Sequence, residues 1–154
     1  MEQLSEFEKF ELNLTDETKG YLSETAKWAY FLAILGFIGL GLMILFGLFF
    51  GTIMGNLPGG DPYEGLGFTS GILGFIYVII ALIYFFPISY LFKFAKKMKN
   101  ALKSSDNTEL TSAFSNLKSH YKFIGIFTII ILSLYVLIFI IGIAGGLAAA
   151  AGSI

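Results

Sequence analysis

The chain has 154 residues, of which 56% are hydrophobic, 17% aromatic and only 14% charged, and its formal net charge is −1. A soluble domain is typically about 45–50% apolar and about 25% charged, so this composition predicts an integral membrane protein rather than an ordinary soluble domain. The near-neutral charge gives no reason to expect a nucleic-acid partner, and the absence of cysteine excludes disulfides and thiolate metal sites.

The chain opens with an acidic arm, residues 1–14. We interpret the arm as flexible, although the alternation of apolar and polar residues at its end also suits a short strand. A helix is predicted from Thr15, whose hydroxyl can cap it, to Gly55. At about 1.5 Å per residue this helix would be about 60 Å long. Its uncharged part, residues 28–55, is long enough to cross a bilayer, so the helix should project about three turns beyond it.

A loop rich in glycine and proline, residues 56–67, joins the first span to a second at residues 68–91. Asp61 and Glu64 in this loop are candidate cation ligands, but the loop is equally explained as a plain connector. Pro87 lies near the inner end of the second span, where it is expected to free one backbone carbonyl and kink the helix.

A polar helical hairpin, residues 92–122, is predicted to extend the second and third spans, the third covering residues 123–148. Asp106 and Glu109 resemble a capping box that opens the second arm of the hairpin after a tight turn at residues 104–107. Each arm carries an apolar stripe at helical spacing, and the stripes should face each other or the first helix. They consist of Leu91, Phe94, Ala95, Met98, Ala101 and Leu102, and of Leu110, Ala113, Phe114, Leu117 and Tyr121. The expected fold is all-α, with a single three-helix membrane domain over residues 15–154.

The placement of lysine predicts an orientation. The hairpin carries seven lysines and the 56–67 loop carries none. By the positive-inside rule, the amino terminus and the hairpin are expected in the cytoplasm, and the loop and the carboxyl terminus in the periplasm. The predicted location is therefore a bacterial inner membrane.

Two runs of sequence resemble a known group of proteins. They are LTDETKGYLSETAKWAYFLAILGFIGL and KNALKSSDNTELTSAFSNLKSHYKFIGIF. Both are similar to small inner-membrane proteins of Bacteroidetes that form a family of unknown function. The resemblance starts near Leu12, and its most specific part is Ala101–Ile126. It implies the architecture and the source, and it implies no mechanism because the family has no established activity.

Glycine spacing predicts where the helices approach one another closely, since GxxxG motifs allow backbone contact. All the motifs fall at the predicted outer end of the spans. The residues are Gly47, Gly51 and Gly55 in the first span, Gly67 and Gly71 at the start of the second, and Gly142 and Gly146 in the third. One bundle of three helices would not use every such face, so a homo-oligomer or a larger membrane complex is expected.

The sequence offers no pattern for catalysis, cofactor binding or a metal centre. His120, the only histidine, is expected to pack at the membrane interface, with a pH-responsive role as the alternative. The spans hold no Asp, Glu, Lys or His, which argues against an ion-coupled transporter.

The hairpin lysines are expected to meet anionic lipid, a partner or the acidic arm, unless they are simply solvated. They are Lys93, Lys96, Lys97, Lys99 and Lys103. The expected function is a non-enzymatic structural or accessory subunit acting through helix packing, with an oligomeric passive pore or small-solute channel as the alternative.

Overall fold

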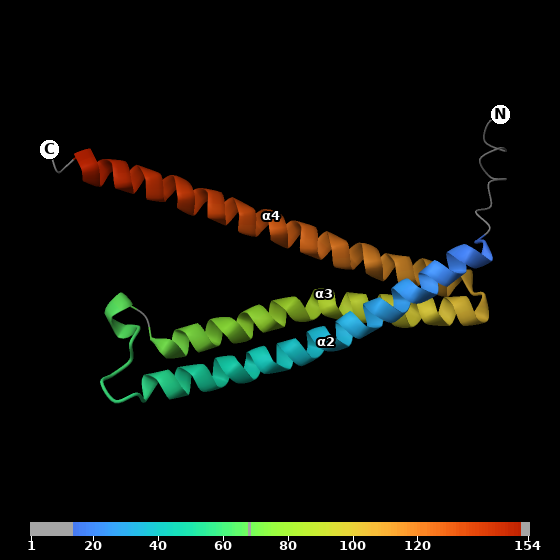
Figure 1. Cartoon of the computed structure of the whole chain (residues 1–154), viewed down its shortest axis with the longest axis horizontal. Helices are drawn as coiled ribbons and strands as arrows, with labels where there is room; N and C mark the ends of the chain where they lie inside the picture. Colours follow the sequence, from blue (N-terminus) through green and yellow to red (C-terminus); the bar gives the residue numbers. More distant parts are fainter. Residues whose placement is uncertain (1–13, 68, 152–154) are drawn as a thin grey trace.

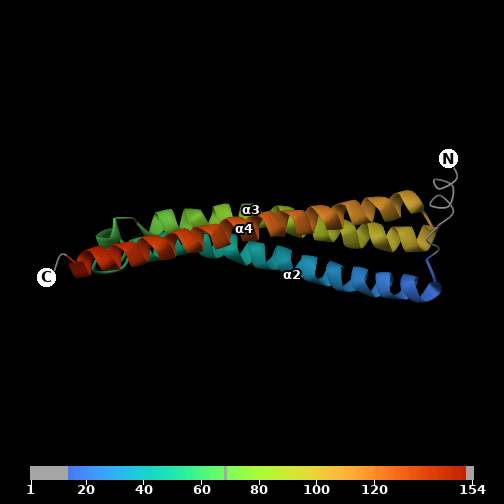
Figure 2. The same cartoon turned by 90° about the horizontal axis from the view of Figure 1, so that it is seen from above.

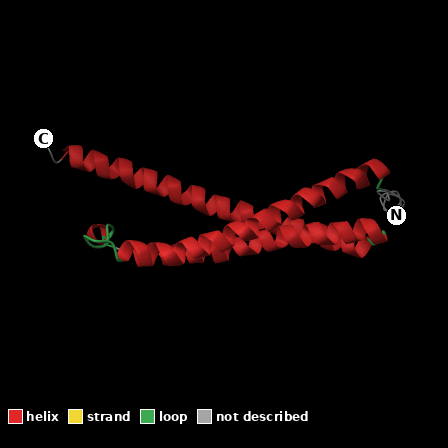
Figure 3. Cartoon of the chain, turned by 60° about the horizontal axis from the view of Figure 1, so that its bottom comes forward, coloured by secondary structure: helices red, strands yellow, loops and turns green. Residues whose placement is uncertain are grey.

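The computed structural model describes residues 14–67 and 69–151, and within them every long element is a helix (Figure 3). Helix α2 covers Asp16–Gly55, the short 3-10 helix η1 Glu64–Leu66, helix α3 Ser70–Ser104 and helix α4 Asn107–Ala151. The predicted all-α fold is confirmed, and each of the three α-helices is long and apolar enough to cross a membrane. The predicted arm, apart from Leu14, lies outside the described residues.

The helices begin and end where local chemistry dictates. Thr15 caps α2, its hydroxyl oxygen accepting a hydrogen bond from the Thr18 N–H at 3.3 Å, as predicted. Ser105 ends α3 with a left-handed φ of 52°, which turns the chain back. The Asp106 carboxylate then accepts hydrogen bonds from the first free N–H groups of α4, at 2.7 Å from Thr108 and 3.3 Å from Glu109.

Helices α2 and α3 run antiparallel side by side, and α4 folds back from α3 at the hairpin turn (Figure 1). The loop between α2 and α3 lies at one end of the molecule, together with the carboxyl end of α4, and the hairpin turn lies at the other. Helix α4 diverges from the other two helices in Figure 1 but overlies α3 in the perpendicular view of Figure 2. Every residue from 132 to 145 of α4 is exposed, so this stretch is not covered by the described part of the chain.

The contact between α2 and α3 follows a repeat of seven residues. Such a repeat keeps one face of each helix against the other through a left-handed crossing. The contact residues are mostly small, which lets the two backbones approach closely. On α2 they are the buried Ala26, Ala33, Leu40 and Gly47, and on α3 they are the buried Gly74, Ala81 and Ala95, with Ile88 partly buried between them.

A compact apolar cluster joins all three helices at the hairpin end. Ala26 and Ala29 of α2 pack with Phe94, Ala95 and Met98 of α3 and with Ala113 of α4. Burying the Phe94 and Met98 side chains contributes about 1.5–3 kcal/mol each. Helix α3 lies between its two neighbours and supplies most of this core.

One prediction about the hairpin is wrong in part. Leu110, Ala113 and Leu117 of α4 do face the cluster, but Phe114 is 45% exposed and Tyr121 is 64% exposed. Helical spacing from Leu110 fits both Ala113 with Leu117 and Phe114 with Tyr121. The apolar pattern of the sequence is therefore wider than the face that is buried. Ala113 is fully buried where α4 approaches α3, and Phe114, the next residue, is turned about 100° away around the helix.

Candidate functional site

A pocket of about 890 Å³ lies between α2 and α3 at the hairpin end of the molecule. Four lysines line it: Lys27 from α2, and Lys96, Lys99 and Lys103 from α3. The α3 lysines recur at helical spacing, so they fall on the side of α3 beside the apolar cluster. No Asp or Glu is among the lining residues, so the pocket is cationic.

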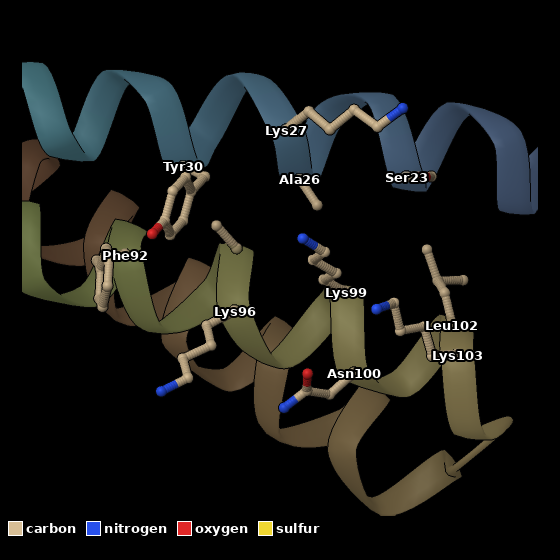
Figure 4. Close-up of a pocket in the computed structure, with 11 residues that line it drawn as sticks. Ser23, Ala26, Lys27, Tyr30, Phe92, Lys96, Lys99, Asn100, Leu102 and Lys103 are labelled. Atoms are coloured by element: carbon tan, nitrogen blue, oxygen red, sulfur yellow. The ribbon is translucent and has the colours of Figure 1, made fainter.

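Charged and aromatic side chains lie at opposite ends of the pocket. Figure 4 shows Lys99 projecting from α3 into the space between the helices, Lys103 extending along α3, and Lys27 lying along α2 and extending toward Ser23. Lys96 lines the pocket but points away from α2. Tyr30 and Phe92, whose ring centroids are 5.3 Å apart, close the opposite end from Ser23. The pocket therefore has an aromatic end beside the apolar halves of α2 and α3 and a cationic end away from them.

The direction in which each lysine side chain tilts follows from the direction of its helix. Side chains on an α-helix tilt toward its amino terminus. Because α2 and α3 are antiparallel, Lys27 leans away from the apolar half of α2 whereas Lys99 and Lys103 lean toward the apolar half of α3.

The predicted lysine surface divides into two groups. Lys96, Lys99 and Lys103 are exposed and line the pocket, whereas Lys97 forms an ion pair with Glu109 of α4 at 3.6 Å and Lys93 is exposed outside the pocket. Lys27 was not among the predicted surface residues. The signal that could have found it is the polar stripe Ser23, Lys27 and Tyr30 at helical spacing on α2.

The predicted packing glycines also divide. Gly47 and Gly51 of α2 contact the backbone of Gly74 and Gly71 of α3. A Cβ atom on Gly47 would lie 2.7 Å from the Gly74 carbonyl oxygen, and one on Gly51 would lie 3.0 Å from the Gly71 Cα. These positions have no room for a side chain, so the contact is between two helices of the same chain.

The remaining glycines of the prediction make no such contact. Gly55 and Gly142 have open space where a Cβ would be placed, and Gly146 lies outside the residues whose surroundings are described. Gly67 precedes α3 with a φ of +82°, so it ends the short helix η1 and does not belong to a helical GxxxG face. Glycine serves there because an L side chain rarely adopts a positive φ.

Asp61 acts as a structural cap in the loop. One carboxylate oxygen accepts hydrogen bonds from the Ser70 hydroxyl at 2.7 Å and the Tyr63 N–H at 3.0 Å, and the other accepts one from the Ser70 N–H at 2.6 Å. The Ser70 hydroxyl, followed by the Tyr63 N–H, lowers the pKa of Asp61. The Asp61 carboxylate therefore caps the start of α3, and no group of three His, Asp or Glu residues is found among the described residues.

His120 links α4 to α3 at the middle of the molecule. Its Nδ1–H donates a hydrogen bond of 2.7 Å to the carbonyl oxygen of Pro87, and its ring lies 5.4 Å from that of Tyr121. This bond fixes the Nδ1–H tautomer, because a carbonyl oxygen only accepts. The half-buried ring thus has a packing role at the point where α4 begins to leave α3.

Three long apolar helices with polar extensions are the fold expected of a multi-pass membrane protein. Within that class, the chain belongs to a family of unknown function (DUF5362), whose match covers residues 67–143, half of the chain. The matched residues comprise α3, the hairpin turn and most of α4, and they include the Ala101–Ile126 pattern. No curated protein matches the chain, and no solved structure does.

Proposed function

We propose that this protein is a non-enzymatic accessory subunit of the bacterial inner membrane that associates with a second copy of itself through α4. In this proposal the hairpin and the start of α2 lie in the cytoplasm, and the loop before α3 lies in the periplasm. The lysines of the hairpin and their absence from the 56–67 loop support that orientation.

The observation that carries the proposal is Tyr135 on the uncovered half of α4. Its side chain is 67% exposed and has no hydrogen-bond partner among the described residues. Tyr135 lies about 18 Å beyond Phe123, near the middle of a hydrocarbon layer about 30 Å thick. A hydroxyl left unbonded in such surroundings costs about 1–3 kcal/mol.

A second copy of the chain can remove this cost. A phenol hydroxyl both donates and accepts, so two Tyr135 side chains related by a two-fold axis can bond to each other. The hydroxyls of Tyr77 and Tyr84 also have no hydrogen-bond partner among the described residues, so the hydroxyl alone does not set Tyr135 apart. The difference is position: the rings of Tyr77 and Tyr84 pack within the chain against Phe46 and Phe127, with centroids 5.4 Å and 5.5 Å apart, whereas Tyr135 lies on the exposed half of α4.

The glycines of α2 do not support self-association on that helix. Gly47 and Gly51 are occupied by Gly74 and Gly71 of the same chain. The longest uninterrupted exposed stretch among the three helices is residues 132–145 of α4, and it is the surface we assign to a neighbour. Helix packing in lipid gains mainly from van der Waals contact and interhelical hydrogen bonds, and α4 offers both.

A passive pore is the second candidate. Thr128 and Tyr135 are both exposed and lie seven residues apart on one face of α4, where several copies could present hydroxyls to a water-filled path. Bilayer recordings of the purified protein separate the two functions. A reproducible, selective current would favour the pore, and its absence alongside stable self-association would favour the accessory subunit.

Self-association itself is tested by energy transfer between labelled copies in liposomes at increasing lipid dilution. Tyr135→Phe keeps the ring and removes the hydroxyl, and it should weaken association by about 3- to 17-fold, the range of interhelical hydrogen bonds in membranes. Tyr77→Phe makes the same chemical change at a packed position and should leave association unchanged. A wild-type protein that stays monomeric at every dilution would refute the proposal.

A further inference from the structure

The pocket between α2 and α3 has a charge that nothing in the described chain neutralises. None of its four lysines forms an ion pair with a described residue, and the described pairs are Lys19 with Asp16 and Lys97 with Glu109. Cationic amino groups held near one another repel, so a bound anion would stabilise their arrangement. All four lysines are exposed, so the pocket is open to a ligand that carries the counter-charge.

The pocket also has an apolar side, which restricts the kind of anion. Ala26 and Ala95 lie in its floor, and the rings of Tyr30 and Phe92 close the end beside the apolar halves of the helices. A small hydrophilic anion would use the amino groups and leave this aromatic end unfilled. An anion attached to a hydrocarbon chain would use both ends.

The membrane-side end of the pocket lies at the depth of the head-group layer of a bilayer. That layer extends about 5–8 Å beyond the hydrocarbon on each side. Under the proposed topology, Lys27 adjoins the start of the first span, and Lys96 lies about 8 Å beyond Leu91. Lys99 and Lys103 start further from the membrane, and their tilt along α3 brings their amino groups back toward it (Figure 4).

We infer that this pocket is a binding site for one anionic phospholipid, with the phosphate held by Lys27, Lys99 and Lys103 and the start of an acyl chain lying against Tyr30 and Phe92. Basic pockets between membrane helices on the cytoplasmic side are known to take such head groups. A volume of about 890 Å³ suits a ligand of this size class. The inference rests on the membrane orientation proposed above, and it does not depend on self-association through α4.

Native mass spectrometry of the full-length protein tests the site directly. Delipidated protein is titrated with phosphatidylglycerol or with phosphatidylcholine, and the number of lipids retained per chain is counted. We expect one tightly retained phosphatidylglycerol per chain and no matching site for phosphatidylcholine. Equal retention of the two lipids would overturn the inference.

Charge-matched variants separate a discrete site from general surface attraction. Lys99→Gln and Lys27→Gln should each weaken phosphatidylglycerol retention about fivefold. Lys93→Gln and Lys118→Gln remove the same charge from exposed positions that do not line the pocket, and they should change it by less than about twofold. A similar loss in all four variants would mean that no discrete site exists.

Two further arms distinguish other sources of the anion. Inorganic phosphate or ATP that displaces phosphatidylglycerol at equal concentration would identify a soluble phosphate compound as the ligand and overturn the lipid assignment. Deleting residues 1–13 should leave lipid retention unchanged, whereas a large gain would mean that the acidic arm is the natural occupant. The same spectra report the oligomeric mass. A protein that forms a dimer but retains no phosphatidylglycerol would overturn the lipid site and leave the proposed self-association standing.

Discussion

Gly74→Ala adds a single methyl group at the tightest point between α2 and α3. The new Cβ would overlap the Gly47 carbonyl oxygen, which belongs to the backbone of α2 and cannot rotate away. The helices must then separate, and a gap of 0.5–1 Å already forfeits about a quarter to a half of each van der Waals contact along the seam. Overpacking of this kind costs about 1–3 kcal/mol.

Gly41→Ala is the matched control. Gly41 is in the same pair of helices but has open space where its Cβ would be placed. Both variants gain the same helix propensity, about 0.5–1 kcal/mol, so the difference between them isolates the steric effect. We expect Gly74→Ala to be about 1–3 kcal/mol less stable than Gly41→Ala.

The assay is reversible unfolding in mixed detergent micelles, followed by helicity and by the fluorescence of the single tryptophan, Trp28. Because the two variants differ by position alone, their denaturation midpoints can be compared directly. Equal stability of Gly74→Ala and Gly41→Ala would refute the close backbone contact between α2 and α3.

Three further predictions concern topology, the hairpin and the loop. In intact cells, a cysteine at Glu64 should react with an impermeant thiol reagent and one at Ser104 should not; the reverse pattern would invert the proposed orientation. Ala113→Asp should destabilise the hairpin by several kcal/mol because Ala113 is fully buried, while Phe114→Asp should cost about 1 kcal/mol or less; protease resistance of the purified variants measures both. Hydrogen bonds lower the folded-state pKa of Asp61, so its contribution to stability is full above the ordinary carboxyl pKa and is lost as the pH falls through the lowered value. Acid should therefore reduce the thermal stability of the wild type more than that of Asp61→Asn, and identical pH profiles would contradict the role of the cap.

The helices could be predicted from the sequence because their signals are local. Thr15 at the start of α2 and the turn before Asp106 depend on neighbouring residues, and long apolar runs need no tertiary information. The same holds for the three candidate spans. Which residue of α4 faces α3 could not be predicted, because Ala113 and Phe114 both fit the helical pattern. Only the packing of α4 against α3 shows that Ala113 is the buried one.

The pocket could not be predicted because it depends on how two distant segments align. Lys27 and Lys99 line the same pocket only because the antiparallel register places Ala26 beside Ala95 and Gly47 beside Gly74. The sequence does contain a pattern that indicates this register, namely small residues at multiples of seven positions in both helices. They are Ala26, Ala33 and Gly47 in α2, and Gly74, Ala81 and Ala95 in α3. The GxxxG spacing did predict Gly47, Gly51 and Gly71, which lie in the contact, but it also predicted Gly55, Gly67 and Gly142, which have open space where a Cβ would be placed.

The proposed association through α4 is tested most directly by oxidative cross-linking of single-cysteine variants in native membranes, since the chain has no cysteine of its own. Leu132→Cys and Phe139→Cys keep Tyr135 and place the thiol one turn away on the same face of α4, and they should form a disulfide-linked dimer. Leu42→Cys and Leu82→Cys place the thiol on exposed faces of α2 and α3 near the middle of their apolar stretches, and they should remain monomeric. No dimer at positions 132 and 139, or equal dimer formation at all four positions, would contradict association through α4.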